Sequence, residues 1–225
     1  MWDQLDRPVW NALTSGWAKF ALGGPKAIQL APEYGPFAAT VDRSVGSLAA
    51  LALCTPSEHD LWIVETDDFP PPPGMTVVTR APVVQMVASD VSASPPDFEV
   101  VALQEADAPE MLALARLTKP GPFTVATHRL APFIGIRRDG RLVAMAGERM
   151  KMPGLSELSG VCTHPDYRGN GYGDVLSRLV TRRILDRGET AFLHAYEGNT
   201  VAIGLYRAMG YVHRRTVTLT VLKRG

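Results

Sequence analysis

The segment that most restricts the fold is a glycine-rich loop between an apolar strand and a long helix. The strand is predicted over residues 155–163, a turn follows at Pro165, and the helix is predicted over residues 171–187. Backbone N–H groups at a helix start lack internal partners, and the helix dipole adds about half a positive charge there. Because glycines let an anion approach this backbone closely, the segment predicts a phosphate or pyrophosphate site.

The same loop pattern has other interpretations. Its glycines could serve only the turn, because a Gly-x-Gly before a helix is weak evidence by itself. The loop is not a P-loop, since no Gly-Lys-Ser or Gly-Lys-Thr follows it. A dinucleotide-binding fingerprint would need an early βαβ unit, whereas strands typical of antiparallel hairpins come first here.

The elements around the loop predict an α+β fold. Strands are predicted over residues 98–103, 132–137, 141–149, 190–195 and 211–222, and helices over residues 107–117 and 199–209. Asp139-Gly140 predicts a tight hairpin turn between the second and third of these strands. Hairpins followed by a strand–helix–strand unit indicate a mixed, mostly antiparallel sheet flanked by helices.

Two proline-rich breaks interrupt the chain, at residues 70–74 and 92–96. The second break predicts a boundary near Ser94. Residues 1–93 are then a smaller N-terminal α/β half without an identifiable chemical motif, and residues 94–225 form the domain that carries the chemistry. In the first half, helices are predicted over residues 2–21 and 44–53, and strands over residues 61–64 and 76–79.

The charges of the chain balance, with 23 Lys and Arg against 23 Asp and Glu. A net charge of zero gives no bulk electrostatic reason to expect nucleic acid or an anionic membrane as a partner. Cys54 and Cys162 lie in apolar settings and are interpreted as buried thiols in a reducing compartment. No signal-peptide pattern and no apolar run of membrane-spanning length is found, so a cytoplasmic protein is expected. Cys162 and His164 alone make no metal site, and no metal is expected.

The glycine loop resembles a known family signature. Arg168-Gly169-Asn170-Gly171-Tyr172-Gly173 matches the Arg/Gln-x-x-Gly-x-Gly/Ala signature of GCN5-related N-acetyltransferases (GNAT). Downstream, the segment from Asn199 to Tyr211 is similar to the family's Asn-x-x-Ala-x-x-Leu-Tyr-x-x-x-Gly-Phe helix, with Tyr in place of the final Phe. The lead-in Val-Cys-Thr-His-Pro at residues 161–165 most resembles the FR47-like branch, which includes the C-terminal half of glycine N-acyltransferases. The resemblance covers residues 98–225, and by position the first half is a candidate for a degenerate copy of the same fold.

This resemblance implies that acetyl-CoA or another acyl-CoA is a co-substrate. It would lie in a V between the strand that ends at Thr163 and the strand that begins at Thr190. Its pantetheine arm would pair with the backbone of the first strand, and its pyrophosphate would lie on the amides of the glycine loop. The residues expected to bind it are Val161, Cys162, Thr163, Arg168, Gly169, Asn170, Gly171, Tyr172, Gly173, Asp174, Asn199 and Tyr206.

The chemistry implied is attack of a neutral amine on a thioester. Neutralising a lysine-like amine at pH 7 costs about 4–5 kcal/mol, whereas an α-amino group costs only about 1.4 kcal/mol. A general base therefore matters most for a lysine-like acceptor. Tyr206 matches the family tyrosine that protonates the departing thiolate, and its alternative role is to pack the short helix onto the sheet.

Glu157 is the candidate general base, because some protein-acetylating members of the family carry their catalytic glutamate at about this distance before the glycine loop. Strand alternation puts Glu157 on the same face as Val161 and Thr163, unless a bulge changes the alternation. Otherwise it is an exposed glutamate near a strand start. His194 is a second candidate base, with a core histidine as its alternative, and Asn199 is expected to cap its helix first and to contact pantetheine second.

These observations favour an enzyme that moves an acetyl or other short acyl group from acyl-CoA to the amine of a small molecule or amino acid. One alternative is a protein or peptide acetyltransferase in which the first half docks the macromolecule. Another is a module that binds acyl-CoA without turnover, although the motif with Asn199 and Tyr206 argues against it. A homodimer is left open.

Overall fold

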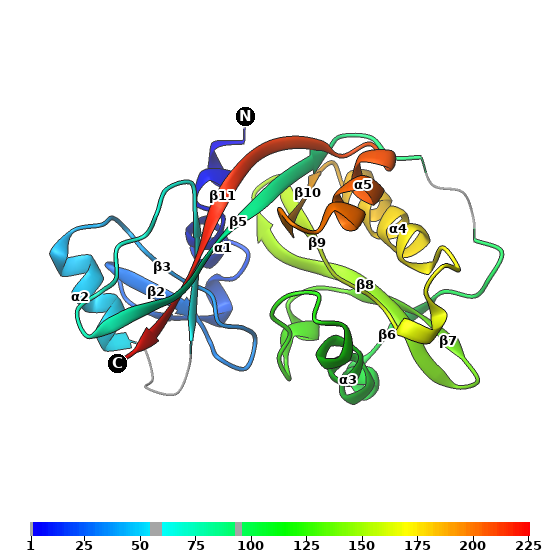
Figure 1. Ribbon diagram of the computed structural model, residues 1–225, viewed down its shortest axis with the longest axis horizontal. Helices are drawn as coiled ribbons and strands as arrows, with labels where there is room; N and C mark the ends of the chain where they lie inside the picture. The colour runs from blue at the N-terminus through cyan, green and yellow to red at the C-terminus, as the bar shows by residue number, and fades with distance from the viewer. Residues whose placement is uncertain (1, 55–59, 93–95) are drawn as a thin grey trace.

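An eight-stranded sheet is the frame of the computed structural model, which describes residues 2–54, 60–92 and 96–225 (Figure 1). The strand order is β4-β11-β5-β10-β9-β8-β7-β6. The strands are β4 (Leu61–Glu65), β5 (Met75–Ala88), β6 (Val101–Leu103), β7 (Phe133–Arg138), β8 (Arg141–Met152), β9 (Leu155–Thr163), β10 (Thr190–Tyr196) and β11 (Val212–Arg224). Neighbours pair antiparallel except β9 and β10, which pair parallel. The predicted mixed, mostly antiparallel sheet flanked by helices is confirmed.

The helices are α1 (Pro8–Leu13), α2 (Val45–Cys54), α3 (Ala108–Thr118), α4 (Tyr172–Asp186) and α5 (Thr200–Ala208). The predicted helix over residues 2–21 is wrong in extent, because only α1 is α-helical there. Pro8 can start a helix but cannot continue one, and it occupies the first turn of α1. Gly16 lies against β8, where an added Cβ would be 2.5 Å from the carbonyl oxygen of Lys151.

The N-terminal part has a small sheet of its own, which the sequence did not predict. It consists of β1 (Ala21–Gly23), β2 (Ala27–Leu30) and β3 (Ala38–Thr40). The same part also supplies β4 and β5 to the large sheet, and Figure 1 shows β5 and β11 running together between the two sides of the molecule. The division into residues 1–93 and 94–225 therefore does not coincide with a break in the sheet. The expected boundary at Ser94 falls in residues 93–95, outside the described residues.

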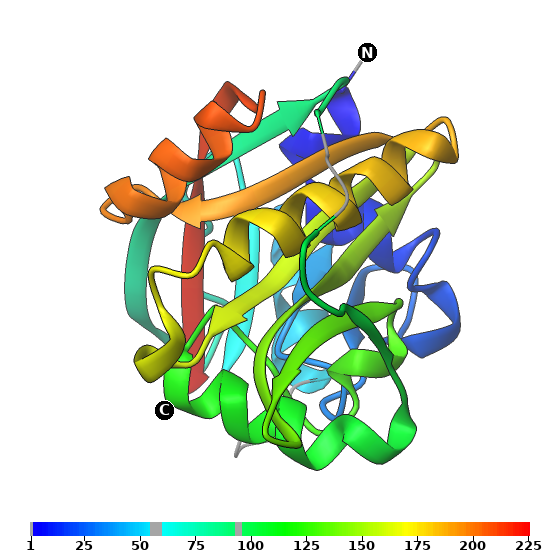
Figure 2. The same cartoon turned by 90° about the vertical axis from the view of Figure 1, so that its right-hand side faces the viewer.

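Helices α3 and α4 cover opposite faces of the sheet. Leu176, Val180 and Ile184 on α4 pack in a cluster with Ala146 of β8. Met145, the residue before Ala146, points to the other face and packs with Met111 and Leu114 of α3. Figure 2 looks onto α4 where it lies across the strands. Among the described residues, no helix is long and apolar enough to cross a membrane.

A β-bulge in β9 reverses the alternation of its side chains. Met145 pairs with Cys162 and Gly147 with Ser159, so β9 carries one extra residue, and Gly160 within it has φ +63°. Leu158 and Val161 consequently both pack in the cluster under α4. The prediction that Glu157 shares a face with Val161 and Thr163 is therefore wrong.

The ring of Phe133 packs directly against this bulge. A Cβ on Gly147 would lie 2.4 Å from Cγ of Phe133, and a Cβ on Gly160 would lie 2.6 Å from its Cε1. Real Cβ atoms do not approach this closely, so the ring occupies the space that two side chains would need. Glycine at both positions is what allows the ring to lie against the strands.

We expect Gly147→Ala to lower the free energy of unfolding by about 1–3 kcal/mol, because the added methyl group displaces the Phe133 ring. Gly24→Ala is the matched control, since an added Cβ there meets nothing within 4 Å. Urea denaturation measures both. In a Phe133→Leu background the cost of Gly147→Ala should shrink, and an unchanged cost would show that the ring is not the cause.

Candidate active site

The parallel strands β9 and β10 separate at the centre of the sheet. They pair at only three positions, from Thr190 opposite Leu155 to Phe192 opposite Glu157. Beyond this point β10 stays paired with β5, and β9 stays paired with β8 as far as Thr163. Among the described residues, no strand thus lies beside the edge of β9 from residue 158 to residue 163 on the β10 side. This fork is the V that the sequence resemblance implies.

The glycine loop lies at the start of α4, next to the end of β9. Gly171 is the N-cap residue of α4, and both Gly169 (φ +82°) and Gly171 (φ +74°) are left-handed. An added Cβ at either position would meet nothing within 4 Å, so the backbone is open to solvent there. Gly173 faces the end of β9, because a Cβ on it would lie 3.6 Å from Oγ1 of Thr163 and 3.9 Å from Cγ1 of Val161. The loop, the helix start and the free edge of β9 are therefore contiguous.

Other predicted loop residues differ in what they can offer. Arg168 and Asn170 are exposed, and Nδ2 of Asn170 donates to the carbonyl of Tyr167 at 3.0 Å. Asp174 forms an ion pair with Arg178 at 2.9 Å along α4.

The side chain of Tyr172 is buried and packs edge-on against Phe98 at 5.1 Å between ring centres. Cys162 is also buried and points toward α3, and burial raises the pKa of its thiol to about 12. Tyr172 and Cys162 can therefore contribute only backbone groups to a ligand in the fork.

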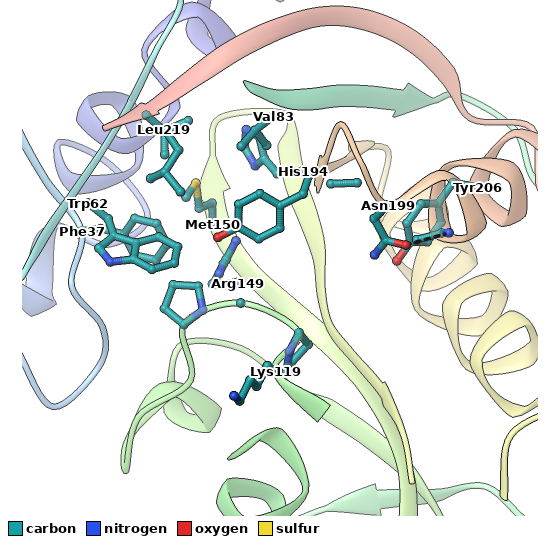
Figure 3. A pocket seen from close by; sticks show the side chains of 17 residues that line it. Phe37, Trp62, Val83, Lys119, Arg149, Met150, His194, Asn199, Tyr206 and Leu219 are labelled. Atoms are coloured by element: carbon teal, nitrogen blue, oxygen red, sulfur yellow. Dashed lines mark hydrogen bonds between the residues drawn. The ribbon is translucent and has the colours of Figure 1, made fainter. Parts of the chain in front are cut away.

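A cavity of about 130 Å³ lies at the fork and brings together three predicted residues, namely His194, Asn199 and Tyr206. Figure 3 shows Asn199 and Tyr206 on one side of it and the aromatic side chains of Phe37 and Trp62 on the other. The far wall thus comes from the N-terminal part of the chain.

Tyr206 both packs and lines this cavity. Its side chain is buried, and its ring lies 5.9 Å from that of Tyr211. Burial raises the pKa of the phenol to about 12, so Tyr206 carries its proton at neutral pH. Asn199 likewise has two roles. Its side chain accepts a hydrogen bond from the backbone N–H of Ala202 at 3.2 Å and also lines the cavity. Its predicted capping role is confirmed.

Glu157 lies at the apex of the fork in a buried network. Its oxygens accept hydrogen bonds from Nε and Nη2 of Arg149 at 2.9 and 2.8 Å, from the backbone N–H of Met150 at 3.2 Å, and Nδ1 of His194 lies at 2.8 Å. Burial by itself would raise the pKa of Glu157, but the charge of Arg149 and the hydrogen bonds from His194 and Arg149 outweigh it and hold the pKa well below its usual range.

These contacts argue against Glu157 as a general base. A base needs a free lone pair that can reach the acceptor, but both oxygens are occupied and the side chain is only 1% exposed. The alternative expectation, an exposed glutamate near a strand start, is wrong, because the bulge turns Glu157 into the interior instead. Glu157 is placed to hold Arg149 and His194.

The tautomer of His194 follows from its neighbours. Arg214 donates from Nη1 to Oε1 of Gln85 at 2.9 Å, so the amide nitrogen of Gln85 is the atom that faces His194. This nitrogen lies 3.0 Å from Nε2 of His194, which must therefore accept, and Nδ1 carries the proton toward Glu157. Both ring nitrogens are thus engaged. The interpretation as a core histidine agrees with this geometry, although His194 also lines the cavity.

Several cavity residues were not among those that the sequence predicted. Arg149 had a usable signal, because an arginine within the apolar strand β8 needs a buried partner. Phe37, Trp62 and Lys119 had none, since only the tertiary fold brings them to the fork.

Comparisons with known proteins agree with this geometry. Residues 133–220 match the family model described as FR47-like protein. A solved structure from Novosphingobium aromaticivorans DSM 12444, assigned to the GNAT family of acetyltransferases, is 44% identical over 98% of both chains, with a TM-score of 0.92. None of the curated proteins compared with this chain matches it.

Two more distant structures show the same fold. A GCN5-related N-acetyltransferase from Kribbella flavida is 19% identical, over 97% of this chain and 96% of that one, with a TM-score of 0.64. A tandem GNAT protein from the clavulanic acid biosynthesis pathway is 13% identical, over 87% and 77% of the two chains, with a TM-score of 0.56. On the strength of the first similarity, this chain belongs to the GNAT family of acetyltransferases, and the match of residues 133–220 to the FR47-like model agrees with this.

Proposed function

We propose that this acetyltransferase moves an acetyl or other short acyl group from acyl-CoA to the amine of a small molecule or amino acid. The observation that carries the proposal is the cavity at the fork, which connects Tyr206 with a wall formed by Phe37 and Trp62. A wall on the side opposite Tyr206 limits the size of an acceptor. It favours a small amine over the polypeptide that the alternative of a protein acetyltransferase requires.

The fork and the loop fit acyl-CoA. The unpaired edge of β9 at Val161 and Thr163 offers backbone groups to an extended pantetheine arm, much as a neighbouring strand would. The open, left-handed backbone at Gly169 and Gly171 offers amide groups and the positive end of the α4 dipole to the pyrophosphate. Acyl-CoA would supply the activated acyl group as a thioester.

Tyr206 is the residue we assign to proton transfer. Acylation of a neutral amine forms a C–N bond and breaks the C–S bond, so the amine gives up one proton and the departing thiolate takes one. Tyr206 holds its proton at neutral pH and donates it to the sulfur, and the proton released by the amine restores the phenol through solvent. Glu157 holds Arg149 and His194 in place and moves no proton.

Gly171→Val should abolish the rise in melting temperature that CoA produces, because the new side chain occupies the space that the phosphates approach. Gly188→Val is the matched control, since Gly188 also has a positive φ (+76°) and open space around it, but lies after α4. Both variants lose a similar stability from backbone strain, roughly 1–2 kcal/mol. If Gly171→Val binds CoA as tightly as the parent protein, the pyrophosphate does not lie on this loop.

Tyr206→Phe should lower kcat by roughly ten- to a thousandfold and leave the affinity for CoA nearly unchanged, because only the hydroxyl is lost. Tyr211→Phe removes the same group from a neighbouring ring whose hydroxyl bonds Thr181 at 2.8 Å, so kcat should be retained. Thiol release with a panel of amines measures both. An unchanged kcat in Tyr206→Phe refutes the acid role when chemistry limits turnover. If the parent protein releases no thiol with any amine, the result supports the alternative of a non-catalytic acyl-CoA-binding module.

A further inference from the structure

The cavity contains hydrogen-bond donors that have no acceptor among the residues that the structure describes. Arg149 gives Nε and Nη2 to Glu157, but Nη1 donates to none of the residues that the structure describes. Nη1 lies toward Gly121, a cavity-lining residue on which an added Cβ would be 3.8 Å away. The guanidinium is fixed in this orientation, because Glu157 holds its other edge and the ring of Phe37 lies 4.9 Å from its central carbon. A pre-oriented donor that faces a cavity and has no partner among the described residues is suited to an acceptor atom on a ligand.

A second cation, Lys119, lines the same cavity. It follows the last residue of α3 in a left-handed conformation (φ 51°), and its backbone N–H donates to the carbonyl of Ala115 at 2.7 Å. This cap fixes where its side chain leaves the backbone, and Figure 3 shows Lys119, an exposed residue of the cavity lining, below Arg149. No ion pair joins Lys119 to an acidic residue within the described part of the chain.

The charges around the cavity have one sign. Its described lining includes Arg149 and Lys119 but neither an aspartate nor a glutamate. The charge of Arg149 is balanced by Glu157 behind it, so Lys119 leaves the cavity with a net positive charge. A cationic acceptor such as a polyamine would find no counter-ion there, whereas a carboxylate would find Lys119 together with the free edge of Arg149.

The aromatic wall of the cavity and the lack of a free general base among Glu157 and His194 restrict the chemistry of the acceptor further. Phe37 and Trp62 pack edge to face, with ring centres 6.3 Å apart, and offer an apolar surface. Both oxygens of Glu157 and both nitrogens of His194 are engaged, so neither is free to deprotonate the amine. The acceptor amine must therefore lose its proton to solvent, and a lysine-like amine, which costs about 4–5 kcal/mol to neutralise at pH 7, is the least suited to this.

We infer that the acceptor is an amino acid with an apolar or aromatic side chain, whose carboxylate is bound by Nη1 of Arg149 and by Lys119 and whose α-amino group is acylated. This inference rests on the proposed acyl transfer. The carboxylate anchors the molecule between the two cations, the side chain lies against Phe37 and Trp62, and the amino group is directed toward Tyr206.

Three matched amines test it in the enzyme supplied with acetyl-CoA, namely L-phenylalanine, L-phenylalaninamide and phenethylamine. With kcat/KM calculated on the concentration of neutral amine, because the three amines differ in pKa, the value for phenylalanine should exceed that for each of the other two by about tenfold or more, which is the size expected of a charged hydrogen bond. Lys119→Gln should reduce this ratio, and Arg116→Gln, a change on α3 outside the cavity, should leave it unchanged. Arg149 is unsuitable for substitution, because its loss would strand the buried Glu157.

A binding measurement separates this inference from the proposed function. Calorimetry with N-acetyl-L-phenylalanine and with N-acetylphenethylamine compares the two products without turnover, and only the first should bind tightly and lose affinity in Lys119→Gln. Equal affinities of the two products would overturn the inference and leave acyl transfer intact. A higher kcat/KM for phenylalaninamide or phenethylamine than for phenylalanine would do the same. Carboxylate-dependent binding without acylation of any amine would support the anion site and overturn the proposed transfer.

Discussion

The buried ion pair between Arg149 and Glu157 is the interaction on which the site depends. Glu157 is the last residue of β9 that pairs with β10, so its carboxylate lies where the two strands separate. Arg149 reaches it from β8 and His194 from β10, which ties three strands together at the apex of the fork. Two charges buried in this way are costly to desolvate, and removing one partner from such a pair typically costs about 3–5 kcal/mol. Beyond Glu157, β9 and β10 can therefore separate, while before it the two strands stay paired.

The network continues from this pair into the N-terminal part of the chain. His194 contacts Gln85 of β5, and Gln85 donates to the carbonyl of Leu5 at 2.7 Å. Arg214 of β11 joins Gln85 to Asp6. The N-terminal segment is thus bonded to the same group of side chains that holds the apex. This connection explains how residues remote in sequence, such as Phe37, can form a fixed wall opposite Tyr206.

Local signals in the sequence predicted the elements that build the fork. The strand expected over residues 155–163 is found as Leu155–Thr163, because a turn bounds the apolar run on each side. The helix expected over residues 171–187 is found as α4, and Asn199 caps α5 as its residue type predicts. These features depend on neighbours in the chain, so periodicity and capping rules reach them.

The features that the sequence could not predict depend on distant contacts. Alternation placed Glu157 on the wrong face, because the bulge at Gly160 is set by the ring of Phe133 from β7. The environment of Glu157 follows from Arg149 and His194, whose positions only the sheet order defines. The three short strands over residues 21–40 carry too few residues for a period to be recognised.

A crystal structure of the protein with CoA tests the central claim most directly, namely that the fork is the acyl-CoA site and opens into the acceptor cavity. We expect the pyrophosphate on the backbone amides between Gly169 and Gly173, the pantetheine arm along β9 from Val161 to Thr163, and the sulfur beside the hydroxyl of Tyr206. CoA bound away from the fork, or bound there with its sulfur directed away from Tyr206 and the cavity, would contradict the claim.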